Sequence, residues 1–214
     1  MRDEPGPLAD ARARGGPLGP VPRQSARADR PRHRPRRSGE DPHPVSQAHA
    51  VRAEAWRGIR QEPWRILRIA DRPDLVPLVA NWLWDAFWQP GGHRLEEVRE
   101  ILAAADAEIG TPQSFVLMAG EIPCGTASFM SADLEIRNDI GPWLAGLYVV
   151  PEARGQGCAQ RLVTAVEEAA RRSGEKALYL HTEDAQGLYE GLGWYAVGEG
   201  SDHGRPVTIM RRDL

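Results

Sequence analysis

Helical spacing of apolar residues predicts two consecutive helices in the middle of the chain. From 75 to 88 the apolar residues recur on more than one face, and Pro90-Gly-Gly92 ends the pattern. From 95 to 109 one apolar side opposes acidic residues, and Gly110-Thr-Pro112 ends the second helix. Asp74 directly precedes the first apolar run, so we expect its side chain to cap the N-terminus of that helix.

Short apolar runs predict strands on both sides of these helices. We expect strands at 65–70, 114–119, 125–130, 143–150, 177–181, 195–197 and 206–211. Two more helices, at 157–172 and about 185–191, lie before and after the strand at 177–181. This order predicts an α/β fold (an α+β mixed sheet) of about 150 residues, with helices packed against the sheet.

The charge and proline content of the chain change near residue 60. Residues 1–60 carry 13 Arg and 7 acidic residues, whereas residues 61–214 carry 14 basic and 23 acidic residues. Nine of the 18 prolines precede residue 45, and no aromatic residue precedes Trp56. A segment of this composition cannot bury enough apolar area to offset its ordering entropy. We therefore predict a disordered leader over 1–60 and one folded domain over 61–214.

Three hypotheses account for the leader. It is an arginine-rich arm for nucleic acid or an acidic partner, a targeting segment, or the product of a start assigned too far upstream, without a role. The prolines and the lack of an apolar core argue against targeting. A single Lys against 26 Arg indicates codon bias, which argues against nucleic acid as a partner. The hypothesis that the leader has no role, called the passive hypothesis below, is favoured.

Composition also excludes several classes of protein. There is no run of about 18 apolar residues, so neither a membrane span nor a membrane partner is predicted. Cys124 and Cys158 alone form neither a disulfide scaffold nor a zinc site, and His33, His43 and His49 lie in the leader without further ligands. We predict no metal and expect a reducing, cytoplasmic location.

A glycine-containing loop carries the clearest chemical signal. A strand ends at Val150, and a helix begins inside Arg-Gly-Gln-Gly-Cys-Ala, residues 154–159. Small residues let the backbone approach a ligand, and the unpaired amides of a first helical turn favour a phosphate or pyrophosphate. A Walker loop and the dinucleotide fingerprint both fail to match. The alternative is a helix start with small residues for tight packing.

The folded part, from about Arg65 to Arg211, resembles the GNAT superfamily of acyl-CoA N-acyltransferases. The family loop [QR]-x-x-G-x-[GA] is met by Arg154, Gly157 and Ala159. The family helix A-x-x-L-Y-x-x-x-G-[FW] is met by residues 185–194. The chain departs from the family pattern at Thr182, where the family often has Asn. This departure affects one of the contacts with CoA that the resemblance implies.

The resemblance implies a mostly antiparallel, GNAT-like sheet in which strands 143–150 and 177–181 splay apart around acetyl-CoA. Backbone groups near Leu147 and Val149 would pair with the pantetheine arm. Tyr189 matches the family's usual general acid, which protonates the CoA thiolate; a core tyrosine is the alternative. The remaining implied cofactor-binding residues are Arg154, Gly155, Gln156, Gly157, Cys158, Ala159 and Thr182.

An amine acceptor must lose a proton before it attacks. For a primary amine with a pKa of about 10.4, deprotonation at neutral pH costs roughly 4.6 kcal/mol. The strand 143–150 has no carboxylate, which leaves Asp85, Asp133, Glu135 and His181 as candidate bases, or a base acting through water. The acidic residues after 131 suit a cationic small-molecule or peptide amine.

These observations predict an N-acetyltransferase that moves an acetyl group from acetyl-CoA to a primary amine by direct transfer in a ternary complex. The alternative is a non-catalytic, acyl-CoA-binding sensor module with the same fold. Trp82, Trp84 and Trp88 belong either to the core or to an acceptor pocket, and an exposed tryptophan face would favour a homodimer.

Overall fold

A seven-stranded mixed sheet forms the centre of the fold. The computed structural model describes residues 63–134, 137 and 139–214, so the predicted leader over 1–60 lies outside the described residues. Every neighbouring strand pair is antiparallel except β4 and β5. In sheet order the strands are β1 (Trp64–Arg68), β2 (Gln113–Ala119), β3 (Ile122–Met130), β4 (Trp143–Val149), β5 (Ala177–Thr182), β7 (Arg205–Asp213) and β6 (Tyr195–Asp202).

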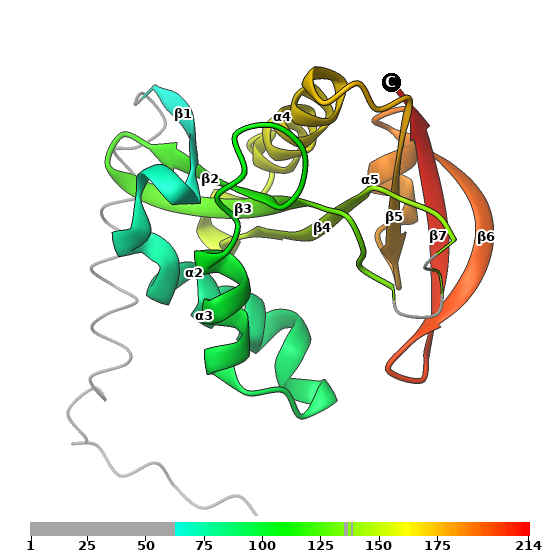
Figure 1. Ribbon diagram of the computed structural model, residues 1–214, viewed down its shortest axis with the longest axis horizontal. Coiled ribbons are helices and arrows are strands. Elements are labelled where there is room, and N and C mark those ends of the chain that lie inside the picture. The colour runs from blue at the N-terminus through cyan, green and yellow to red at the C-terminus, as the bar shows by residue number, and fades with distance from the viewer. Residues whose placement is uncertain (1–62, 135–136, 138) are drawn as a thin grey trace, which may run out of the picture. The chain divides into compact units, whose positions relative to one another are not determined.

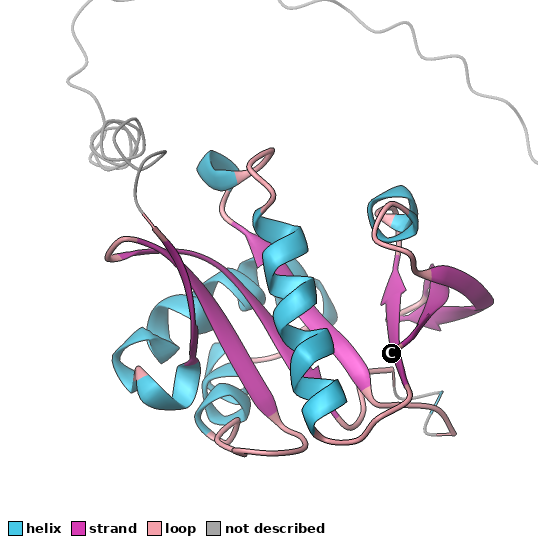
Figure 2. Cartoon of the chain, turned by 90° about the horizontal axis from the view of Figure 1, so that it is seen from above, coloured by secondary structure: helices cyan, strands magenta, loops and turns pink. Residues whose placement is uncertain are grey.

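Helices cover both faces of this sheet. One face carries α4 (Cys158–Arg172), and the opposite face carries α2 (Val76–Leu83) and α3 (Leu95–Ala103), as Figures 1 and 2 show. The short α5 (Gln186–Glu190) follows β5. Trp194, just beyond α5, donates its indole N–H to the buried Glu167 of α4 at 3.1 Å. The predicted α/β class and element order are therefore confirmed.

The first predicted helix, over 75–88, is not one continuous α-helix. After α2 the chain passes through a π-helical turn, η3 (Trp84–Trp88), and a 3-10 turn, η4 (Gln89–Gly91), before Gly92 adopts a left-handed φ of 77°. The predicted Asp74 cap is wrong. Its carboxylate binds the Arg72 guanidinium at 2.8 Å, and α2 begins without a side-chain cap.

The second predicted helix ends earlier than its apolar pattern indicated. α3 stops at Ala103, and Ile109, placed by the pattern on the apolar side, is 74% exposed. Beyond the helix, Asp106 forms an isolated bridge with Gln113, the first residue of β2. Pairing with the sheet thus replaces the last predicted turns of the helix.

Two neighbouring strands separate along their length. β4 and β5 pair only at Trp143 and Tyr179, where the Tyr179 amide donates to the Pro142 carbonyl at 2.9 Å. β4 also contains one residue more than β3 between the pairs Thr126–Tyr148 and Ser128–Ala145. Within this bulge Gly146 has a left-handed φ of 57°. The splayed pair implied by the sequence is therefore present.

Candidate active site

The loop between β4 and α4 presents an open helix N-terminus. Gly157 precedes α4 with a φ of 75°, and no side chain caps the helix. Gly155 is also left-handed, with a φ of 73°, and a Cβ at either glycine would meet nothing within 4 Å. The amides of the first turn, from Cys158 onward, have no partner within the helix. This part of the loop has the geometry of an anion cradle.

Two side chains of the same loop fold back onto its backbone. Arg154 donates from Nε to the Val149 carbonyl at 3.1 Å, and Gln156 donates from Nε2 to the Glu152 carbonyl at 3.2 Å. Both contacts brace the loop between β4 and α4. Both residues, with Gly155, also line a small pocket at this loop.

The open edge of β4 carries backbone groups that no strand uses. Val150 donates its amide to Cys124 of β3 at 3.0 Å. Because successive residues of a strand point their backbone groups to opposite edges, those of Val149 and Leu147 face the gap toward β5. Beyond Trp143 and Tyr179, β5 does not pair with them. This edge is therefore open to a ligand, apart from the Val149 carbonyl, which accepts the hydrogen bond from Arg154.

Cys158 contributes its amide to the cradle, whereas its thiol belongs to the core. The side chain is 2% exposed and lies against the Cys124 thiol of β3. Burial and the neighbouring Cys158 raise the pKa of the Cys124 thiol to about 12, and burial also raises the pKa of Cys158. Both thiols therefore remain protonated and unreactive.

Tyr189 of α5 is buried beside Trp194. The two rings meet edge to face with centroids 6.1 Å apart, and Tyr189 is 7% exposed. Burial, and then the negative charge of Asp133, raises the pKa of the phenol to about 12. A protonated hydroxyl without a hydrogen bond to any described residue is available as a proton donor.

Asp133 and His181 form an ion pair. The Asp133 carboxylate lies 3.0 Å from Nε2 of His181, and the two side chains are 26% and 17% exposed. Burial lowers the pKa of His181, but the hydrogen bond and charge of Asp133 outweigh it, so the pKa is raised. The structure thus brings together three of the residues predicted for catalysis: Asp133, His181 and Tyr189.

The other predicted site residues lie apart from this cluster. Asp85 is exposed on η3 and forms no ion pair or hydrogen bond with a described residue. Glu135 lies outside the described residues. Thr182, at the end of β5, accepts the Ala185 amide at Oγ1 (3.0 Å), so it supports the start of α5.

Two segments approach each other on the sheet face that carries α2 and α3. The ring of His203, in the turn between β6 and β7, lies 5.3 Å from the ring of His93, between η4 and α3. Trp82 of α2 stacks on Tyr148 of β4 at 5.7 Å. Among the described tryptophans, Trp82 is buried and Trp84 and Trp88 are half-buried. The exposed tryptophan face that would favour a homodimer is therefore not seen there.

Sequence reasoning missed Gly146 and His203. Gly146 has no motif of its own in the sequence, and its role depends on the register between β3 and β4. Both strands of the β6–β7 hairpin were predicted, but His203 follows a run rich in Gly and polar residues, so no apolar pattern indicated that β6 continues to Asp202. An Asp-His-Gly sequence at 202–204 was the available signal for a tight turn.

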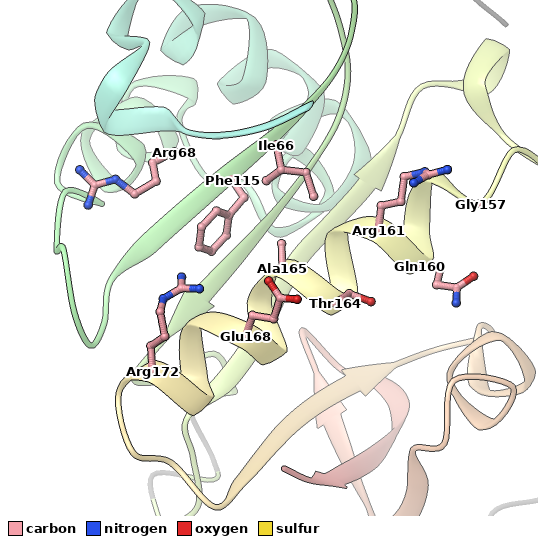
Figure 3. Close-up of a pocket in the computed structure, with 10 residues that line it drawn as sticks. All are labelled: Ile66, Arg68, Phe115, Gly157, Gln160, Arg161, Thr164, Ala165, Glu168 and Arg172. Atoms are coloured by element: carbon pink, nitrogen blue, oxygen red, sulfur yellow. The ribbon is translucent and has the colours of Figure 1, made fainter. Parts of the chain in front are cut away.

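A cavity lies between α4 and the strands β1 and β2. It measures about 670 Å³ and touches the cradle only at Gly157. Figure 3 shows its two walls: Ile66, Arg68 and Phe115 on one, and α4 side chains including Gln160, Arg161 and Arg172 on the other. It contains neither Tyr189 nor Asp133, so its size alone does not identify the catalytic centre.

Two further findings concern membranes and metals. None of the described helices is both long and apolar enough to cross a membrane. In the same part of the chain, no group of three or more His, Cys, Asp or Glu side chains could hold a metal ion.

Comparison with known proteins identifies the family. A model of the "Acetyltransferase (GNAT) family" matches residues 76–194, a span that includes α2, the cradle and Tyr189. The chain belongs to the GNAT family of acetyltransferases and is an acyltransferase. No curated protein sequence matches it at a significant level.

Solved structures share the fold. An aminoglycoside 6′-N-acetyltransferase complexed with coenzyme A is 17% identical, with a TM-score of 0.55, over 70% of this chain and 96% of that one. An acetyltransferase from Streptococcus agalactiae 2603 is 15% identical, with a TM-score of 0.54, over 71% and 98%. A protein from Salmonella typhimurium with its cofactor acetyl-CoA is 18% identical, with a TM-score of 0.53, over 72% and 94%.

Proposed function

We propose that this acyltransferase transfers an acetyl group from acetyl-CoA to a primary amine, directly and within a ternary complex. The observation that carries the proposal is the combination of three features around one gap: the open cradle at Gly157, the unpaired edge of β4, and the buried hydroxyl of Tyr189. Each feature suits a different part of an acyl-CoA and its reaction.

The cradle would hold the pyrophosphate through backbone amides. Hydrogen bonds to charged oxygens contribute roughly 1.5–3 kcal/mol each, so three or four amides suffice to anchor a nucleotide tail. The open space at Gly155 and Gly157 leaves room for phosphate oxygens close to the backbone. Arg154, Gln156 and Thr182 would support this region through the contacts that brace the loop and α5.

The edge of β4 would orient the acyl group. When bound, acetyl-CoA supplies a thioester whose carbonyl carbon accepts the amine. The backbone groups of Leu147 and the amide of Val149 would pair with the pantetheine arm, and an amide at the bulge would polarise the carbonyl. Two proteins with related folds contain CoA or acetyl-CoA in their structures, which supports this choice of co-substrate.

Tyr189 would donate a proton to the departing thiolate. Its raised pKa keeps the donor protonated at neutral pH. Asp133 and Asp85 are the carboxylates proposed from the sequence to assist the amine; of these two, Asp133 is the one whose charge affects Tyr189. The side chains around His181 are mainly acidic, which favours a cationic small molecule or peptide, and we propose that the protein acts in the cytoplasm.

Calorimetric titration of acetyl-CoA into the full chain tests the cradle. We expect binding in the micromolar range, lost in Gly157→Glu because the carboxylate repels the pyrophosphate. Gly174→Glu is the matched control, since Gly174 is also left-handed (φ 82°), has equally open surroundings and lies just after α4. Equal affinity in both variants would contradict the cradle.

Turnover tests the reaction. Release of CoA from acetyl-CoA is measured with spermidine, kanamycin, tyramine and a peptide with a free N-terminus, each product being confirmed by mass spectrometry. Acetylated amine from at least one of these supports the proposal. Tight acetyl-CoA binding without turnover of any of them would overturn it in favour of the non-catalytic sensor.

A further inference from the structure

We infer that His181, oriented by Asp133, is the base that removes the proton from the acceptor amine. The inference rests on the proposed function and deepens it, because it assigns the base. Asp133 is then the residue that orients this base. It is carried by the location of His181 beside the gap, by its contact with Asp133, and by the charges that face it.

The alternation of β5 places His181 on the acceptor side of the sheet. Leu178 and Leu180 point into the main core, which includes the inner face of α4. Tyr179 points the other way and packs with Trp143, and His181, two residues on, shares that face. Its ring meets the edge of the Trp143 ring at 6.2 Å. The imidazole thus lies just past the point where β4 and β5 separate, on the sheet face opposite α4.

Asp133 fixes which ring nitrogen is free. Its carboxylate lies 3.0 Å from Nε2 and favours a proton there, so the neutral imidazole would carry its lone pair on Nδ1. Nδ1 forms no hydrogen bond with a described residue. Because both side chains are more than two-thirds shielded from water, the ring is held in one orientation.

The charges that face His181 come from three segments. They are Asp133 in the loop after β3, Asp202 at the end of β6, and Glu183 directly after β5. The Arg205 guanidinium of β7 binds Glu183 at 3.1 Å and offsets part of its charge. The surroundings remain net negative, which favours both the imidazolium that forms during the reaction and a cationic acceptor.

These residues and solvent account for every proton that is transferred. The ammonium proton of the cationic acceptor passes to Nδ1 of His181, and the freed amine nitrogen forms a bond to the acetyl carbon while the carbon–sulfur bond breaks. The second proton that the nitrogen loses as the amide forms goes to solvent. Tyr189 gives its proton to the sulfur and becomes a phenolate. The His181 imidazolium then loses its proton to solvent, and the phenolate recovers one from solvent. No oxidant, metal or further co-reactant is required.

Kinetics of His181→Gln and Asp133→Asn in the full chain test the inference, with the amine from the panel above that turns over fastest. His181→Gln should lower kcat by about 10²- to 10⁴-fold with little change in the KM for acetyl-CoA. The wild-type acidic limb should lie above pH 6.5, because the base must be neutral and its pKa is raised. Asp133→Asn should move that limb to lower pH, since it removes the charge that raises the pKa. Asp213→Asn, at the far end of β7, is the control for loss of one carboxylate.

Each outcome separates the inference from the proposed function. Near wild-type kcat in His181→Gln, or an acidic limb that stays in place in Asp133→Asn, would overturn the base while leaving acetyl transfer intact. No turnover by the wild-type protein would overturn the proposed function, and the base with it. The amine titrates identically in every assay, so a shift between variants belongs to the protein. If His181→Gln fails to fold, the pH–rate profile of Asp133→Asn and an NMR titration of His181 test in its place whether His181 is the base.

Discussion

Asp133 affects the protonation of two side chains with opposite tasks. Its hydrogen bond and charge help to raise the pKa of His181, and its charge adds to burial in raising the pKa of Tyr189. For the acid Tyr189 the raised pKa keeps the resting state protonated, whereas for the base His181 it stabilises the imidazolium that forms when the ring takes a proton. These changes in pKa depend on contacts between residues that are far apart in the sequence.

Replacing Tyr189 by Phe should lower kcat by about 10²-fold while acetyl-CoA affinity stays the same. The hydroxyl makes no hydrogen bond with a described residue, so the free energy of unfolding should change by less than about 1 kcal/mol. Because the pKa is raised to about 12, wild-type activity should show no basic limb from this group near pH 10. Tyr195→Phe, at an exposed tyrosine bound to Asp213, is the control. An unchanged kcat would identify Tyr189 as a core residue.

The two cysteines should resist thiol reagents in the folded protein. Cys124 and Cys158 are 0% and 2% exposed, and the pKa of Cys124 is raised to about 12, so the thiolate is scarce at pH 8. We expect slow labelling by Ellman's reagent in buffer and rapid labelling of both in guanidinium. Rapid labelling of the native protein would show that the segment from β3 to the start of α4 opens readily.

At the scale of elements, Gly146 determines where β4 bends. The bulge at Gly146 lets the strand bend away from β5, and its left-handed φ of 57° is unfavourable for other residues. A Cβ at this position would lie 3.4 Å from Leu83 of α2, which is an ordinary contact. The demand for glycine therefore comes from the backbone and not from crowding.

Gly146→Ala should destabilise the protein by about 1–2 kcal/mol, the cost of a left-handed alanine. If the bulge flattens to relieve that strain, Leu147 shifts and kcat/KM should fall by about 10²-fold. Denaturant unfolding and steady-state kinetics measure the two effects. Gly174→Ala is the control, because it imposes similar strain after α4, away from the gap. Equal kinetic losses in both variants would refute a special role for the bulge.

The difference between local sequence patterns and long-range pairing explains which parts of the fold and site the sequence could predict. The order of helices and strands, the start of α4 beside Gly157 and the position of Tyr189 on α5 follow from local patterns, and the structure has all of them. The bulge at Gly146, the π turn at Trp84–Trp88 and the early end of α3 depend on strand pairing and packing, which no local pattern records. Asp133 and His181 were separate candidates whose contact became evident only in the fold.

At the scale of the whole chain, the described residues contain a large apolar core. The buried apolar residues of the described region run from Ile69 to Met210, and the family match covers residues 76–194. The related structures are covered over 94–98% of their own length by only 70–72% of this chain. We therefore expect residues 61–214 to complete a fold of this kind without the arginine-rich leader.

Deletion of residues 1–60 should leave acetyl-CoA affinity within about twofold and the thermal midpoint within a few degrees, because a segment of this composition has little apolar area to bury. Binding to a mixed-sequence DNA duplex, measured across salt concentrations for both chains, decides between the passive and the nucleic-acid hypotheses. The passive hypothesis predicts equally weak binding by both. Binding by the full chain alone, with log K falling linearly with log salt, would contradict it and identify residues 1–60 as an arm that neutralises phosphates. A lower midpoint in 61–214 would instead contradict the domain boundary at 60.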